Sequence, residues 1–344
     1  MSYRDKCEGR KRSPHPNPPP QDGGREFLSP LPPSCGGGLG WGERGVVLIL
    51  ALFIMALIAA MAIAMMARLQ RDIYRTSLLV HAVQAELYAQ GSVAWAIDQL
   101  REDWEKKQPG SLVDKLPIAS PVKNMQGYRV DSVIDDAQGY FNLNNLSVPE
   151  AQPDFQHLVN GVMPELNAKM AMDLAKALSD WVTPGLRDSF YDKYYLKLQP
   201  AYRAAHRSML SVSELRLIKG MTPALYEKLL PYVTALPEKT AINVQLAAPQ
   251  VLVTLSPTLT LAAAQQIENY RKQVPFTAVD KFTNFEIVKN HKISADKVTV
   301  TSAYFLVTTT VTIGVEKYLL YTLVSRVMQN EKLQIKIVWQ SKVR

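Results

Sequence analysis

An unbroken apolar run over residues 46–67 is the strongest pattern of hydrophobic and polar positions in the chain. An α-helix rises about 1.5 Å per residue, so this run would span about 33 Å, more than a bilayer core of about 30 Å. No polar residue interrupts it, and it therefore predicts a single transmembrane helix. By the positive-inside rule alone, Arg44 before the run and three arginines after it would place the C-terminal part in the cytoplasm.

The helix is expected to continue beyond the membrane as an amphipathic segment. Apolar residues recur at steps of three, four and seven, which is the spacing of one face of an α-helix. The members of this predicted stripe are Leu69, Ile73, Val80, Val83, Leu87, Ala94, Ile97, Leu100 and Trp104. Pro109 and Gly110 would end the helix. The pattern predicts one helix of about 60 residues, whose second part lies with this stripe against a domain.

Strand-like sequence brackets a long helical region. Residues 126–134 alternate between polar and apolar positions, and strand patterns return at residues 297–311, 318–327 and 333–339. Gly314, followed by Glu316 and Lys317, marks a hairpin turn. Prolines cut residues 150–292 into several short helices. The simplest architecture is an α+β fold in which an antiparallel sheet packs on the long helix and a large all-α domain is inserted between its strands.

Composition and pattern divide the chain into parts. Residues 1–45 include a stretch rich in proline and glycine that cannot bury a core, and we expect a disordered leader there. The transmembrane part of the helix follows at residues 46–67. Residues 68–148 and 294–344 are expected to form the domain that contains the sheet, and residues 149–293 are expected to form the inserted α domain.

No motif for catalysis or cysteine chemistry follows the apolar run. The only cysteines, Cys7 and Cys35, precede it, so disulfides and cysteine-ligated zinc sites are excluded after it. The five histidines lack HExxH spacing, and neither GxSxG nor a phosphate-binding glycine loop occurs. His206 lies near Ser208 without a third group. We predict that the chain is not an enzyme, and its net charge of +8 fits a solvated surface.

Two segments of the helical region resemble helix-hairpin-helix or SAM-like units, at residues 211–230 and 242–276. In the nucleic-acid-binding form, paired glycines let backbone N–H groups approach a phosphate. Gly220 stands alone in the first segment, and residues 257–260 hold no glycine in the second. We interpret both segments as a structural scaffold, with nucleic-acid binding as the alternative.

Two further groups of residues could bind a ligand or serve only the fold. The aromatic side chains could form a ligand face or pack within a compact loop; they are Phe190, Tyr191, Tyr194, Tyr195 and Tyr202. Asp180, Asp188 and Asp192 could share a calcium ion, because calcium takes six to eight oxygen ligands and tolerates irregular loops. The plainer reading of these three carboxylates is a solvated loop.

Taken in order, several motifs resemble the GspK family, the large minor pseudopilins of bacterial type II secretion systems. The motifs are Gly45 before the apolar helix, the FNLNN block at 141–145, Asp180-Trp181, and residues 202–205, 213–216, 220–221, 231–233 and 242–243. The resemblance runs from Gly45 to the C-terminus. It implies that the domain containing the sheet has the pilin-like fold and that the protein acts by assembly.

The resemblance also implies how the N-terminus is processed and oriented. It implies cleavage after Gly45 by prepilin peptidase, N-methylation of Val46, and insertion in the inner membrane with the C-terminal region in the periplasm. This processing route overrides the charge count. The fifth mature position is Leu50, where most pilin-like subunits carry glutamate, and family members of this type also lack that acid. A lone carboxylate in a bilayer is costly unless it is paired.

The partners that the resemblance implies are the I and J minor pseudopilins, the major pseudopilin fibre and prepilin peptidase. It implies a position at the fibre tip, where the protein would initiate or cap the fibre that exports proteins across the outer membrane. A pilin-like protein of DNA uptake is the alternative. The loop that resembles a calcium loop departs from the family, because Arg187 and Ser189 replace two acids and His206 replaces an asparagine. We therefore expect only weak calcium binding at Asp180, Asp188 and Asp192.

Overall fold

The computed structural model describes residues 41–105, 116–125, 127–186 and 188–343. The chain divides into two compact units between Gln70 and Arg71. Most of the predicted leader and the predicted helix end at Pro109 and Gly110 lie outside the described residues. Residues 41–45, which we expected in the disordered leader, already belong to the first helix.

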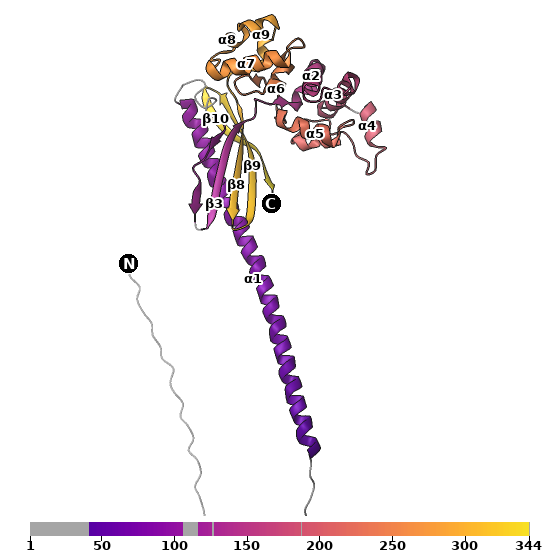
Figure 1. The fold of residues 1–344 in the computed structure, drawn as a ribbon, viewed down its shortest axis with the longest axis vertical. Coiled ribbons are helices and arrows are strands. Elements are labelled where there is room, and N and C mark those ends of the chain that lie inside the picture. Colours follow the sequence, from indigo (N-terminus) through magenta and orange to yellow (C-terminus); the bar gives the residue numbers. More distant parts are fainter. Residues whose placement is uncertain (1–40, 106–115, 126, 187, 344) are drawn as a thin grey trace, which may run out of the picture. The chain divides into compact units, whose positions relative to one another are not determined.

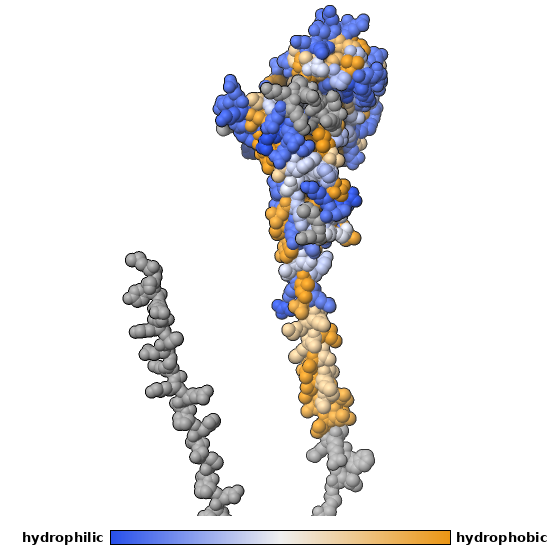
Figure 2. All heavy atoms as spheres, turned by 90° about the vertical axis from the view of Figure 1, so that its left-hand side faces the viewer, coloured by the Kyte–Doolittle hydropathy of each residue, from blue (hydrophilic) through white to orange (hydrophobic). Residues whose placement is uncertain are grey.

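Helix α1 runs without a break from Trp41 to Glu105. It is the one helix of the described part of the chain that is long and apolar enough to cross a membrane. All side chains of residues 46–67 are exposed, and Figure 2 shows their apolar surface along the first part of the helix. This confirms the predicted apolar helix and its continuation beyond residue 67.

The main sheet is entirely antiparallel and has the strand order β1-β3-β8-β9-β10, with β2 also paired to β3 (Figure 1). Its strands are β1 (Ile118–Ala119), β2 (Lys123–Met125), β3 (Tyr128–Asp136), β8 (Tyr304–Ile313), β9 (Glu316–Gln329) and β10 (Lys332–Val343). Alternation of polar and apolar residues predicted β3 and β10, and a high content of strand-forming residues predicted β8 and β9. The short strands β1 and β2 were not predicted, because two or three residues are too few to display a period of two.

Both hairpins of the C-terminal strands turn through residues with positive φ. Gly314, at φ 57°, lies in the turn between β8 and β9, as the sequence predicted. The turn between β9 and β10 uses Asn330 and Glu331 at φ 51° and 60°. Positive φ at both central residues is the type I′ geometry, whose twist matches that of paired strands.

An alanine-rich face of α1 packs on the sheet. The buried side chains of this face recur at steps of three and four and are Ala85, Ala89, Val93, Ala96 and Leu100. They meet buried strand residues, among them Val130, Ile134, Val307, Val311, Leu320 and Val324. Small side chains let the helix axis lie close to the sheet, so branched residues of the strands fill the space between them.

The predicted apolar stripe is therefore largely wrong, because of its nine members only Leu100 is buried and Ile97 half-buried. Val80, Val83 and Leu87 are 48%, 60% and 67% exposed. At about 100° per residue, they lie on the side of the helix opposite to the buried alanine face. Hydrophobicity alone favoured the larger side chains, whereas close packing on the sheet selected the smaller ones.

Arg326 of β9 fixes the end of α1 to the sheet. Its guanidinium donates to the carbonyl of Leu100 at 3.2 Å and to the Asp103 carboxylate at 2.7 Å. A third bond reaches the carbonyl of Ser302 at 3.4 Å. The guanidinium also stacks on Phe305 and Trp104, with its carbon 4.7 and 5.5 Å from the ring centres. The buried cation thus pairs with a carboxylate and with two carbonyl oxygens.

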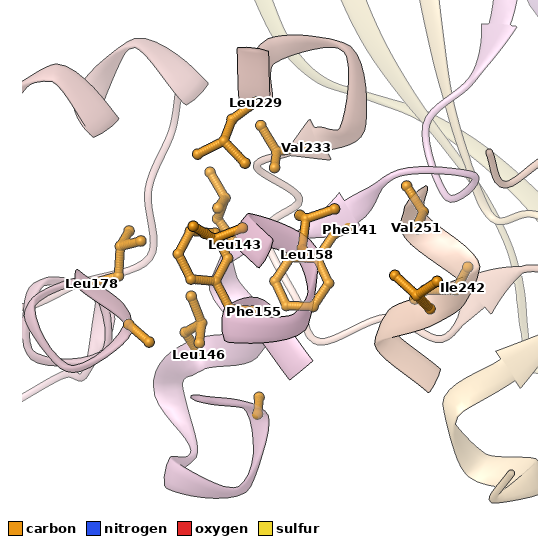
Figure 3. Close-up of a cluster of buried hydrophobic side chains, with 14 of the residues drawn as sticks. Phe141, Leu143, Leu146, Phe155, Leu158, Leu178, Leu229, Val233, Ile242 and Val251 are labelled. Carbon is orange, nitrogen blue, oxygen red and sulfur yellow. The ribbon is translucent and has the colours of Figure 1, made fainter. Parts of the chain in front are cut away.

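The chain leaves the sheet after β3 and returns at β8, and helices lie between. They are α2 (Gln152–Val162), α3 (Ala168–Val182), α4 (Phe190–Tyr195), α5 (Pro223–Leu229), α6 (Pro249–Leu252), α7 (Leu261–Gln273), α8 (Val279–Thr283) and α9 (Glu286–Asn290). Short 3-10 turns join them at Leu143–Ser147, Pro149–Ala151, Val212–Leu217, Leu230–Tyr232, Val253–Leu255 and Ala295–Lys297. These helices share one hydrophobic core, in which Phe141, Leu143 and Leu146 lie against Phe155 and Leu158 of α2 (Figure 3).

The sequence predicted a purely α-helical region here, but the region also contains two short strand pairs. Strand β4 (Phe141–Asn142) pairs in parallel with β5 (Val233–Thr234), and β6 (Ile242–Asn243) pairs in parallel with β7 (Val298–Thr299). Each of these strands has two residues. Pairs this short leave no periodic signal, and they exist because tertiary packing brings distant segments together.

Asp136, at the end of β3, lies buried where the chain leaves the sheet. Desolvation raises its pKa to about 6, against hydrogen bonds from Ser302 and from the N–H groups of Gln138 and Gly139, which lower it. Between about pH 4 and pH 6, the Asp136 carboxyl group therefore holds a proton in the folded state, whereas the unfolded chain, with a pKa of 3.8, has released it. Stability from this group is full below about pH 4 and is lost as the pH rises through about 6.

We therefore predict a pH-dependent gain from Asp136→Asn, which keeps the shape of the side chain and removes the charge. Relative to the unsubstituted protein, the free energy of unfolding of this variant should rise by about 2.4 kcal/mol between pH 4 and pH 7. Denaturant unfolding of the detergent-solubilised chain at a series of pH values measures it. A difference between the two proteins that stays constant with pH would contradict the prediction.

Candidate functional site

Three side chains of the FNLNN block, Asn142, Asn144 and Asn145, bind backbone far away in the sequence, and we call them the asparagine clamp. Asn142 Oδ1 accepts from the Leu236 N–H at 3.1 Å, and its Nδ2 donates to the Glu238 carbonyl at 2.7 Å. The same Oδ1 also accepts from the Asn144 N–H, which caps the 3-10 turn that follows. One side chain thus fixes both its own turn and the segment after β5.

The other two asparagines imitate strand pairing. Asn144 accepts from the Met209 N–H at 2.7 Å and donates to the carbonyls of Met209 and Leu236 at 3.0 and 2.7 Å. Asn145 exchanges both bonds with the backbone of Thr240, at 3.0 and 2.9 Å. An amide side chain has one acceptor and two donor hydrogens, so it can satisfy a backbone N–H and a C=O together. The clamp therefore holds backbone that has no strand beside it.

Gln138 and Asn243 extend the same bonding to the main sheet. Gln138 Oε1 accepts from the N–H groups of Ala303 and Tyr304 at the start of β8, and its Nε2 donates to the Ala241 carbonyl at 3.2 Å. Asn243 Nδ2 donates to the Ser302 hydroxyl at 2.7 Å. These amides join the point where the chain leaves the sheet to the point where it returns.

Gly139 lies between these two sets of bonds, at a position where a side chain would be crowded. A Cβ atom there would lie 3.1 Å from Asp136 Oδ2 and 3.2 Å from the Leu246 Cβ. The N–H of Gly139 also donates to Asp136 Oδ2. The glycine before the FNLNN block thus permits close approach to the buried carboxylate.

The predicted calcium residues are only partly brought together. Asp180 at the end of α3 and the buried Asp192 of α4 lie on either side of Ser189, whose hydroxyl donates to Asp180 Oδ2 at 3.0 Å. Ser189 also caps α4 in a capping box with Asp192. Asp188 is exposed and has φ 52°.

His206 lies between the two carboxylate residues. Its Nε2 is 2.8 Å from Asp192 Oδ2, and its Nδ1 is 3.0 Å from the backbone carbonyl oxygen of Asp180. The sequence had set His206 beside Ser208, but its partner is Asp192. The spacing of 14 residues between them gave no signal, because the loop between α4 and residue 206 has no regular period.

The charges of this cluster follow from burial and from the hydrogen bonds. Burial would raise the pKa of Asp192, but bonds from His206 and from the N–H groups of Ala204 and Ser189 bring it below its usual value. Burial would likewise lower the pKa of His206, but its bonds to Asp192 and to the Asp180 carbonyl raise it. Burial raises the pKa of Asp180 more than the Ser189 hydroxyl lowers it.

These residues do not fit a calcium ion. Among the residues that the structure describes, no three His, Cys, Asp or Glu side chains gather in a way that could hold a metal. The carboxylate of Asp192 already accepts from Ser189, Ala204 and His206, so its oxygens are committed to the protein. The predicted set of Asp180, Asp188 and Asp192 is therefore not a preformed cation site.

The aromatic residues pack mainly against one another. Tyr195 is fully buried, stacks on Tyr202 with ring centres 5.2 Å apart, and meets the edge of Trp181. Its hydroxyl accepts from the Lys219 N–H at 3.1 Å. Lys219 places its ammonium over Phe190 and Tyr194, at 4.8 and 4.7 Å from the ring centres. Of the predicted cluster only Phe190 is largely exposed, which favours the packing interpretation.

The first segment predicted to resemble a helix-hairpin-helix unit contains a 3-10 turn at Val212–Leu217 and helix α5, with Gly220 at φ 88° between them. Gly220 has the positive φ needed for the turn just before α5, and this conformational need explains the single glycine without invoking phosphate binding. The second segment contains β6, α6 and α7.

A stripe of apolar residues on α1 in the second unit has no cover among the described residues. We call it the outer stripe and define it as Ile73, Val80, Val83 and Leu87. Their side chains are about half to two-thirds exposed. They lie opposite the alanine face that packs on the sheet. Apolar residues repeated along one helix face are typical of a surface that packs against other helices.

Comparison with known proteins assigns the chain to a family. Over 299 residues it is 31% identical to the type II secretion system protein K of Pseudomonas aeruginosa, a match that covers 83% of this chain and 89% of the relative. The chain belongs to the type II secretion system protein K family. It is also 30% identical to the protein K of Klebsiella pneumoniae, over 80% of this chain and 90% of that relative.

A family model and a solved structure agree with this assignment. Residues 139–238 match the family described as type II secretion system (T2SS), protein K. The fold is similar to a chain of the crystal structure of the GspK-GspI-GspJ complex from enterotoxigenic Escherichia coli, with a TM-score of 0.66 at 22% identity. That match covers 78% of this chain and 99% of the other. It confirms the α+β fold with a long N-terminal helix and an antiparallel sheet.

The stretch that matches the protein K family contains the asparagine clamp and most of its partners, including Met209 and Leu236. The predicted processing site, in contrast, lies in α1. Gly45 and Val46 are within the helix, and Val46 and Leu50 are 65% and 56% exposed. Cleavage and methylation there stay predictions.

The clamp generates a prediction about stability. Replacing Asn144 by alanine leaves three buried backbone groups without partners, each at a cost of about 1–3 kcal/mol. We expect Asn144→Ala to lower the free energy of unfolding of this protein K by about 3–6 kcal/mol, measured by denaturant unfolding. Asn160→Ala, on α2 outside the clamp, is the control and should change it by less than about 0.5 kcal/mol. Equal effects of the two substitutions would mean that the clamp does not hold the fold.

Proposed function

We propose that this protein K is a minor pseudopilin at the tip of the type II secretion pseudopilus. It acts by assembly rather than by catalysis. It is held in the inner membrane by the apolar part of α1, and the rest of the chain lies in the periplasm. Its partners are the I and J minor pseudopilins, below which the major pseudopilin fibre continues. The similarity to a chain of a GspK-GspI-GspJ complex supports these partners.

The outer stripe is the observation that carries this proposal. Burying a valine or leucine side chain contributes about 1.5–3 kcal/mol, and the stripe exposes four apolar side chains along the helix. The sheet already covers the opposite face of α1. A helix that is engaged on one face and apolar on the other is suited to bind the helices of neighbouring subunits.

Substitution of Val83 tests the proposal. A charge at the centre of a helix interface would be buried without a partner, so we expect Val83→Glu to weaken assembly at least about tenfold. The measurement is the co-purification of this chain with the I and J minor pseudopilins from detergent-solubilised membranes.

The matched control is Val83→Met, which keeps the surface apolar and should leave co-purification unchanged. Helix content measured by circular dichroism should be the same in both variants, because residue 83 is exposed. Retention of both partners by Val83→Glu would exclude the outer stripe as the interface.

We further propose that prepilin peptidase cleaves the chain after Gly45 and that Val46 is then methylated. The support is the junction itself, since the apolar run begins directly after Gly45. Mass spectrometry of the protein from membranes of cells with active peptidase should find N-methylated Val46 as the first residue. An intact leader in such cells would refute the assignment, whereas an intact leader only in cells without the peptidase would support it.

The finer role that we propose is to cap the fibre. Leu50 replaces the acid with which a pilin-type subunit would engage the N-terminal amine of a neighbour. The predicted insert at residues 149–293 adds a helical region that, at about 145 residues, would alone have a radius of gyration of about 15 Å. This mass would obstruct a further subunit while the outer stripe stays available to others. The protein would then be present in few copies, at one fibre end.

A further inference from the structure

The hydrogen bonds around His206 determine which of its ring nitrogens carry protons. Nδ1 faces the carbonyl oxygen of Asp180 at 3.0 Å, and a carbonyl can only accept. Nε2 faces Asp192 Oδ2 at 2.8 Å. The oxygens of Asp192 also accept from the N–H groups of Ala204 at 3.2 Å and Ser189 at 3.4 Å. At 2.8 Å one proton lies between Nε2 and Oδ2, and the two backbone N–H groups that donate to the same carboxyl group stabilise its ionised form, so this proton belongs to the ring and both nitrogens of His206 carry protons.

The ring therefore acts as a cation between two kinds of oxygen that also bind calcium. A backbone carbonyl and a carboxylate are typical calcium ligands in irregular loops. Here the Asp180 carbonyl lies in the last turn of α3, and the Asp192 carboxylate lies on α4. The imidazolium reaches both from a third segment. A divalent ion at this point would repel the imidazolium and would have to displace its hydrogen bonds.

Backbone bonds of the residues beside His206 hold the loop in the same place. The Arg207 N–H donates to the Trp181 carbonyl at 3.3 Å, and the Ala204 N–H donates to Asp192. His206 itself has φ 43°, in the left-handed region where asparagine is among the better tolerated residues. Its side chain thus closes the point at which α3, α4 and residues 204–207 meet.

We propose that the His206 side chain replaces a bound metal ion in this loop, so that the loop holds its structure without calcium. The proposal rests on the hydrogen-bond geometry and is independent of the proposed function in secretion. It stands against the expectation of weak calcium binding at Asp180, Asp188 and Asp192, and the experiment below decides between the two.

The test compares thermal unfolding of the detergent-solubilised full chain in EDTA and in millimolar calcium. We expect the same Tm in both solutions for the unsubstituted protein. His206→Asn fits the backbone conformation but cannot bridge Asp180 and Asp192, and we expect it to lower the Tm by about 2–6 °C in both solutions. His157→Asn, a histidine of α2 outside the loop, is the control and should leave the Tm unchanged.

The substitution Asp192→Asn decides the meaning of any calcium effect. If calcium raises the Tm of the unsubstituted protein and Asp192→Asn abolishes that rise, calcium binds in the loop and the proposal is overturned. A rise that survives Asp192→Asn arises outside the loop, and the proposal then stands on the loss caused by His206→Asn. An unchanged Tm in His206→Asn would also overturn it. The comparison of the unsubstituted protein in the two solutions requires no variant to fold.

Discussion

The fold depends on how the chain pairs its backbone where it leaves the sheet after Asp136 and returns at Tyr304. Buried N–H and C=O groups must find partners, and the small strands β4 to β7 have only two residues each. Side-chain amides supply what these strands cannot. Asn142, Asn144 and Asn145 bind the segments around Met209 and Leu236, and Gln138 binds the start of β8. These amides add to the few backbone bonds at the same place, such as that from the Asn243 N–H to the Gln138 carbonyl at 2.9 Å.

Helix α1 shows how the same element can serve a fold and an assembly. Its alanine face lies close on the sheet, and Arg326 anchors its end. Its larger apolar side chains lie on the other side and remain exposed. Small residues let the helix and the sheet approach closely, and the larger apolar residues form the surface that we propose for contacts between subunits.

The loop that joins α3 to α4 and to residues 204–207 uses an internal cation. A histidine held between a carboxylate and a carbonyl supplies the positive charge that a metal would bring. In this arrangement the structure of the loop depends on the side chain of His206, which is part of the chain, and not on the concentration of a free ion. The aromatic ring of Tyr195, which contacts the rings of Trp181 and Tyr202, packs beside this loop and adds to its stability.

The sequence by itself determined the features that depend on local period and on single residues. The apolar run, the long strands, the turn at Gly314 and the order of the protein K motifs were readable because each repeats or occurs within a short window. Only the tertiary structure decided which face of α1 is buried, that Asn144 binds Met209, and that His206 pairs with Asp192. These outcomes depend on contacts between residues far apart in the chain, and the strength of such contacts is set by packing distance and by available donors. Neither the packing distance nor the available donors can be inferred from a local pattern in the sequence.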